Sequence, residues 1–171
     1  CFGWQTMTWI RLHILAEGQT EENFANDVLM PHLHRFQIHS HIQKIASKIV
    51  HNKPDKKGGI TDYGIARKHL ILLMKEHSKR DCYFTTMFDI YHMPDNFPGY
   101  DAAMLELNRR NYQTCLDILN SKIIADLEPD VSNISRLIPY FQLHEFEALI
   151  FADLEQLQAE YPVVCTNSAM I

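Results

Sequence analysis

The stretch TWIRLHILAE, residues 8–17, decides how this chain is expected to fold. Its apolar residues alternate with others, so that Ile10, Leu12 and Ile14 would share one side of an extended chain. Such alternation predicts a β-strand. The strand ends on a carboxylate, Glu17, directly before a glycine, which is an unusual place for a charged side chain when the preceding residues are apolar.

A helix is expected to follow this strand after a sharp turn at Gly18, which glycine permits. Thr20 is the expected N-cap, and Glu21 and Glu22 would lie in the first turn, where the helix dipole favours acids. Pro31 should kink the helix or divide it, because proline cannot donate a main-chain hydrogen bond. The apolar residues that recur at helical spacing are Phe24, Val28, Leu29, Leu33 and Phe36.

The rest of the chain continues the alternation of strands and helices. The segment at 82–90 is dense in aromatic and β-branched residues and is expected to be a buried central strand, whereas Pro139 indicates an edge or early position in the last strand. This order predicts an α/β fold with a mostly parallel sheet flanked by helices on both faces. The further strands are expected at 38–47, 82–90 and 136–144, the helices at 61–79, 101–127 and 145–161, and the loops at 51–59 and 91–100.

Length and composition indicate one domain of ordinary globular type. The chain has 171 residues, of which 46% are hydrophobic and 22% charged, with a formal net charge of −5. We expect the domain to occupy residues 8–161, with a disordered or artificial leader at 1–7 and a tail at 162–171 that could be truncated. The apolar runs are too short to span a bilayer, and the negative charge argues against a protein that coats nucleic acid.

The cysteines and histidines do not form a recognisable zinc motif. The histidine pairs HLH (32–34) and HSH (39–41) lack an acid partner and are expected to lie on the surface. The cysteines have no CxxC spacing and are interpreted as reduced thiols, which favours a cytoplasmic location. They are Cys1, Cys82, Cys115 and Cys165.

Acids follow the predicted strands and suggest a metal site. Glu17 and Asp89 each come at the end of a strand, and Glu145 and Glu147 follow the last one. The carboxyl ends of parallel strands meet at one edge of the sheet, where ligands usually bind. Carboxylates gathered there repel one another and are costly to desolvate, and a divalent cation relieves both costs. Oxygen ligands suit Mg²⁺ or Mn²⁺.

Three separate segments also carry a resemblance to a known family. They are LAEGQTEENF (15–24), TTMFDIYHMPDNFPGY (85–100) and PYFQLHEFEALIF (139–151). Together they resemble a bacterial family, domain of unknown function 4276, over most of the chain. That family is similar to Toprim domains, the metal-binding fold of topoisomerases, primases and related nucleases. It is often encoded beside an ATPase, in anti-phage or restriction-linked settings.

The resemblance implies roles for particular residues. Glu17 matches the Toprim glutamate after the first strand, and Asp89 matches the first acid of the Toprim Asp-x-Asp motif. The second acid is replaced by Tyr91, and a phenol with a reference pKa of ~10 is a poor Mg²⁺ ligand. A later acid could replace it. The candidates are Asp95, Glu145 and Glu147, with Glu145 favoured because it is nearer the strand end and Glu147 second.

Two functions therefore remain open from the sequence. The first is a Mg²⁺- or Mn²⁺-dependent nuclease acting on DNA or RNA with an ATPase partner, in which His144 would donate a proton to a phosphate or leaving oxygen. The second is a non-catalytic scaffold or sensor subunit of the same ATPase complex, which Tyr91 favours. A homodimer is an open alternative in either case. The residues expected to hold a nucleic-acid backbone are Lys53, Lys56, Lys57, Arg67 and Lys68.

Overall fold

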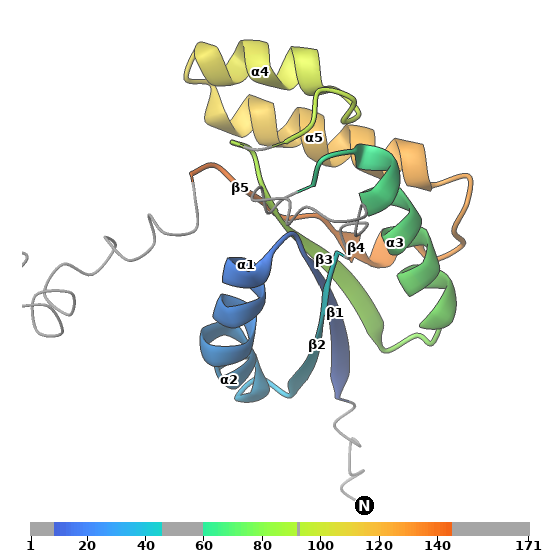
Figure 1. Cartoon of the computed structure of the whole chain (residues 1–171). Coiled ribbons are helices and arrows are strands. Elements are labelled where there is room, and N and C mark those ends of the chain that lie inside the picture. Colours follow the sequence, from blue (N-terminus) through green and yellow to red (C-terminus); the bar gives the residue numbers. More distant parts are fainter. Residues whose placement is uncertain (1–8, 46–59, 92, 145–171) are drawn as a thin grey trace, which may run out of the picture.

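The computed structural model describes residues 9–45, 60–91 and 93–144 and has the predicted α/β architecture. Figure 1 shows the helices arranged around a twisted sheet. The predicted loop at 51–59, the predicted helix at 145–161 and both terminal segments lie outside the described residues. The elements are β1 (Ile10–Ala16), α1 (Gln19–Phe24), the π-helical η1 (Ala25–Leu29), α2 (Met30–His34), β2 (Ile38–Lys44), α3 (Tyr63–Glu76), β3 (Cys82–Asp89), α4 (Tyr100–Asn108), α5 (Tyr112–Leu127), the 3₁₀ turn η2 (Ile134–Arg136), β4 (Leu137–Ile138) and β5 (Phe141–Gln142).

The sheet is parallel throughout the described part of the chain. Its strand order is β2-β1-β3-β4, and β5 pairs with β3 farther along the same strand. β1 is central, with Ile14 opposite Ile42 of β2 and opposite Thr85 of β3. The prediction that 82–90 is a central strand is confirmed, because β3 lies between β1 and β4.

Helices cover both faces of the sheet, as the sequence predicts. On one face, Ile14 and Met87 pack with Ala25 beneath the α1–η1–α2 segment. On the other, Leu15 and Phe84 belong to the larger core that α3, α4 and α5 complete (Figure 1). Neighbouring residues of one strand thus belong to different cores, which is why β1 and β3 are apolar on both sides.

The N-cap of the first helix lies two residues before the expected one. Gly18 is the N-cap, and the Glu21 carboxylate accepts a hydrogen bond of 2.7 Å from its backbone N–H. The prediction of Thr20 as the cap is wrong because Glu21 supplies the reciprocal half of a capping box, which fixes the start at Gly18. The predicted effect of Pro31 is confirmed, since a π-helical turn precedes it and separates α1 from α2.

The helix predicted at 101–127 is in fact a helical hairpin. α4 ends at Asn108 and α5 begins at Tyr112, and the two pack side by side above the end of the sheet (Figure 1). Arg110, in the turn, has a left-handed backbone with φ of 62°. Leu105 of α4 and Tyr112 of α5 lie on different helices and are both exposed.

The last predicted strand, at 136–144, is divided at Pro139. β4 and β5 lie on either side of it, and β4 ends the strand order, which confirms the edge position expected from the proline. The Thr86 hydroxyl bridges the interruption, since it donates to the Tyr140 carbonyl (2.8 Å) and accepts from the Tyr140 N–H (2.9 Å). One side chain thereby replaces the ladder bonds that the proline breaks.

A buried histidine, His13, lies on the side of β1 that faces the larger core. His13 is 3% exposed, its ring stacks on His77 at 4.0 Å and on His41 at 5.3 Å between centroids, and its Nε2 has no hydrogen-bond partner among the described residues. Burial, followed by the neighbouring His77, His41 and Arg11, lowers the pKa of His13 to about 4, against a smaller opposing effect of Asp81. The folded protein therefore holds His13 neutral where an unfolded chain would protonate it.

We expect the free energy of unfolding to fall as the pH decreases from 6.5 towards 4, by about 3 kcal/mol from His13 alone. The unfolded chain binds a proton through this range and the folded chain does not, so acid favours unfolding. His13→Phe, which keeps a ring beside Phe84 and His77, should remove most of this slope. Urea unfolding at several pH values measures it, and equal slopes in the two proteins would contradict the assignment.

Candidate functional site

The carboxylate of Glu17 ties together three segments at the carboxyl end of the sheet. Glu17 follows β1 directly and is buried. Its Oε2 accepts a hydrogen bond of 2.9 Å from the backbone N–H of Asp89, and its Oε1 accepts one of 3.1 Å from the N–H of Ile60. The end of β1 is thus joined to the end of β3 and to the segment that leads into α3.

Asp89 and Glu21 bring further carboxylates to the same edge. Asp89 is the last residue of β3, is buried, and accepts a hydrogen bond of 2.8 Å from the backbone N–H of Tyr91. Glu21, in the first turn of α1, is also buried. The structure therefore brings Glu17 and Asp89 together as the sequence predicts, and it adds Glu21, which the sequence indicates only as a first-turn acid.

The electrostatics of this edge are unfavourable to negative charge. Burial raises the pKa of Glu17, and the nearby charges of Glu21 and Asp89 raise it further, while the hydrogen bonds from the amides of Asp89 and Ile60 oppose the shift. Buried acids with raised pKa values are common where a protein handles protons or cations. A cation bound here would lower the pKa of Glu17, because it favours the ionised form.

The donor atoms suit a hard divalent cation, but the described residues do not complete a site for one. Carboxylate oxygens are the ligands that Mg²⁺ and Mn²⁺ prefer. Among the described residues, however, no group of three histidine, cysteine, aspartate or glutamate side chains is arranged to hold a metal ion. Glu145 and Glu147, the acids predicted to complete the site, lie outside the described residues.

Asp95, the other acid candidate, and Tyr91, at the position where the resemblance leads one to expect a second acid, are both exposed. Asp95 lies in the turn that precedes α4. Tyr91 is 68% exposed and contacts Asp89 through its backbone N–H. The histidines of the HLH and HSH pairs are exposed, as predicted, at His32, His34, His39 and His41.

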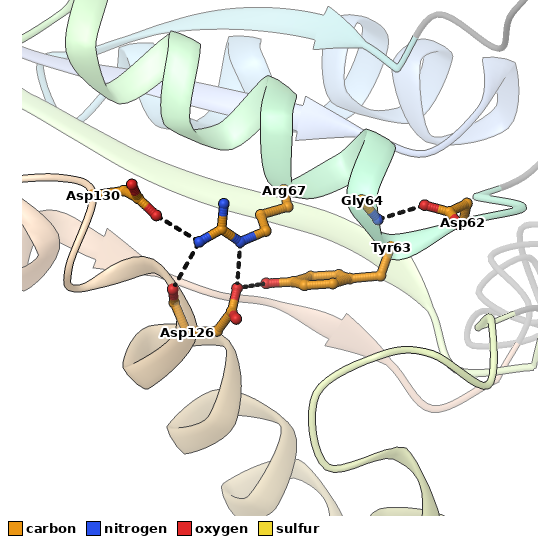
Figure 2. A network of polar contacts seen from close by, with 6 residues as sticks. All are labelled: Asp62, Tyr63, Gly64, Arg67, Asp126 and Asp130. Carbon is orange, nitrogen blue, oxygen red and sulfur yellow. Dashed lines mark hydrogen bonds and ion pairs between the residues drawn. The ribbon is translucent and has the colours of Figure 1, made fainter.

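Arg67, predicted to contact nucleic acid, is engaged within the protein (Figure 2). Its guanidinium forms ion pairs with Asp126 of α5 at 2.8 Å and with Asp130 just beyond that helix. The hydroxyl of Tyr63 donates to the same Asp126 carboxylate at 2.7 Å. These bonds join α3 to α5, so the geometry favours a structural role for Arg67. Lys68 is exposed on α3, and the lysines of the 51–59 loop, Lys53, Lys56 and Lys57, lie outside the described residues.

His144, the predicted proton donor, is exposed just beyond β5 and lines a groove of about 450 Å³. The same groove is lined by Tyr91, Tyr100, Tyr112 and Arg110. Sequence reasoning did not identify this groove, because its residues come from four separate segments. The turn between α4 and α5, which supplies Arg110, was predicted to be helical.

Comparison with known proteins identifies the family of this chain. Residues 16–169 match a family described as a domain of unknown function, DUF4276. No curated protein and no solved structure matches the chain. Within the described residues, none of the helices has the length and apolar character needed to cross a membrane.

We expect Glu17→Ala to lower the free energy of unfolding by about 2–3 kcal/mol, because two buried amides lose their acceptor. Glu17→Gln keeps one acceptor oxygen and removes the buried charge, so its loss should be smaller. Since the pKa of Glu17 is raised by folding, the wild type loses stability as the pH rises through that pKa and the Gln variant does not. Urea unfolding across pH measures both effects, and an Ala variant as stable as wild type would contradict the bridging role.

Proposed function

The chain belongs to the DUF4276 family, and we propose that it is a metal-dependent nuclease that hydrolyses phosphodiester bonds in DNA or RNA. The observation that carries this proposal is the pair of buried carboxylates, Glu17 and Asp89, at the ends of adjacent parallel strands. In open parallel sheets this edge is where ligands bind.

A purely structural explanation accounts less well for these acids. Bridging the amides of Asp89 and Ile60 uses both oxygens of Glu17, but it leaves the repulsion from the nearby charges of Glu21 and Asp89 uncompensated. Placing several carboxylates close together costs free energy unless a cation or proton compensates. Their presence at one sheet edge therefore supports a role in cation binding.

The ion would be held by Glu17 and Asp89, together with Glu145 or Glu147. When bound, Mg²⁺ or Mn²⁺ supplies an activated water and stabilises negative charge on a phosphate. The protein's own groups would orient the substrate and move protons. His144, exposed beyond β5, would protonate the leaving oxygen.

The remaining parts of the proposal concern partners and setting. Lys68 on α3 and the lysines at 53, 56 and 57 would hold the nucleic-acid backbone. We also propose a cytoplasmic location and an ATPase partner that controls access to the site, in phage defence or restriction.

A second function is supported by specific observations. Tyr91 replaces the second acid of the Toprim motif, and both Glu17 oxygens already accept hydrogen bonds from backbone amides. These features fit a non-catalytic scaffold or sensor subunit of the ATPase complex, in which the carboxylate edge would be structural.

Cleavage of supercoiled DNA, single-stranded DNA and RNA in Mg²⁺ or Mn²⁺, with and without the proposed ATPase partner, tests the proposal. We expect metal-dependent cleavage by the wild type and a loss of about 100-fold or more in Glu17→Gln and Asp89→Asn, as is typical of metal ligands. Glu128→Gln and Asp27→Asn remove exposed carboxylates elsewhere and should retain activity.

Thermal unfolding separates folding from ion binding in the same variants. Mg²⁺ in place of EDTA should raise the Tm of the wild type but not that of Asp89→Asn, because a ligand that binds only the folded state stabilises it. Folded protein that neither cleaves nor responds to the ion, with the ATPase present, would exclude the nuclease and favour the scaffold.

A further inference from the structure

The groove beside the carboxylate edge combines aromatic rings with an arginine. It lies between the ends of β3 and β5 and the α4–α5 hairpin, and its volume is about 450 Å³. Tyr91 follows β3, His144 follows β5, and Tyr100 and Tyr112 begin the two helices of the hairpin. Four separate segments thus bring rings to one concave surface.

Two of these rings are exposed to solvent within the groove. Tyr91 is 68% exposed and Tyr112 is 42% exposed. Large aromatic side chains are usually buried, and those exposed in a groove mark a binding surface more often than isolated ones do. The face of a tyrosine ring can stack on any planar aromatic ligand.

Arg110 supplies a positive charge that no described residue neutralises. Its neighbour Arg109 forms an ion pair of 2.8 Å with Glu106, whereas the side chain of Arg110 has no hydrogen-bond or ion-pair partner within the described ranges. Arg110 also has a φ of 62°, a conformation that glycine adopts more readily. An unpaired arginine therefore occupies a backbone conformation that is less favourable for it than for glycine.

We propose that this groove binds single-stranded nucleic acid, with bases stacked on Tyr91 and Tyr112 and a phosphate held by Arg110. This inference rests on the proposed nuclease function and names the form of its substrate. Base–aromatic stacking joined to a few cations is how proteins bind single strands without sequence preference. His144 lines the same groove, where it can contact a phosphate or the edge of a base.

A duplex fits this surface less well than a single strand. Duplex binding depends on many phosphate contacts, and the chain has a formal net charge of −5. Stacked bases in a duplex are also unavailable to tyrosine rings. The groove presents several aromatic rings and one unpaired cation. This combination suits a strand whose bases are unstacked and free to contact the rings.

The groove adjoins the end of β3, where Asp89 lies. The backbone N–H of Tyr91 donates to Asp89 at 2.8 Å, so the first stacking ring is two residues from an acid proposed to hold the ion. A strand with a base stacked on Tyr91 would therefore pass near the end of β3.

Fluorescence anisotropy with labelled oligothymidylate and oligouridylate, in EDTA, tests binding without cleavage. Tyr91→Leu and Tyr112→Leu should each weaken binding about tenfold, and Tyr91→Phe should not, because it keeps the ring. Arg110→Gly should weaken binding and reduce the slope of log Kd against log salt by about one, with an unchanged or raised Tm.

Matched controls come from the same molecule. Arg109→Gln removes the neighbouring charge, which is already paired with Glu106, and Phe36→Ala removes a ring that is 63% exposed near the opposite edge of the sheet. Both should bind as the wild type does. A labelled hairpin duplex and free nucleotides should bind more weakly than the single strands.

The outcomes separate this inference from the nuclease proposal. Single-strand binding that depends on Tyr91, Tyr112 and Arg110 supports the groove even if no cleavage occurs. Binding or cleavage that these variants leave unchanged would overturn the groove and leave the nuclease standing. Preference for the duplex, for a free nucleotide, or no binding at all would also overturn it.

Discussion

The parallel pairing of β1 with β3 is the constraint on which the rest of the structure depends. It brings Arg11–Ala16 beside Cys82–Met87, although these residues are far apart in the sequence. Each strand supplies side chains to both cores, and both end at the same edge. Glu17 extends the pairing past the last strand residue, because its carboxylate holds the N–H of Asp89. The candidate site is therefore a direct continuation of the sheet.

Local patterns were sufficient to predict the architecture. The alternation at 8–17 predicts the first strand, and the density of aromatic residues at 82–90 predicts the central one. The order of strands and helices predicts that the strands pair in parallel. The predicted elements differ from the observed ones where a few residues override a periodic pattern. The hairpin in the region 101–127 depends on one left-handed residue, Arg110, and the division of the last strand depends on how Thr86 bonds across Pro139. Neither feature has a periodic signal.

The candidate site was predictable only in part. The positions of Glu17 and Asp89 followed from strand ends alone, since parallel strands share an edge. The pairing of Arg67 with Asp126 and Asp130 was not predictable, because it requires the relative placement of α3 and α5. The groove of tyrosines was missed for the same reason. Spacing along the chain indicates which residues share an element, but contacts between elements require the fold.

The strand order β2-β1-β3-β4 also determines when the sheet can be completed during synthesis. β1 and β2 emerge first and can pair as soon as β2 is available. The other edge of β1 has no partner until Cys82–Asp89 has left the ribosome, so Ile14 and Leu15 stay beside an open row of backbone donors and acceptors. Open apolar strand edges are templates for association between chains. A nascent chain that pauses before β3 would therefore be the form most prone to aggregate, and chaperone binding would be most useful at that length.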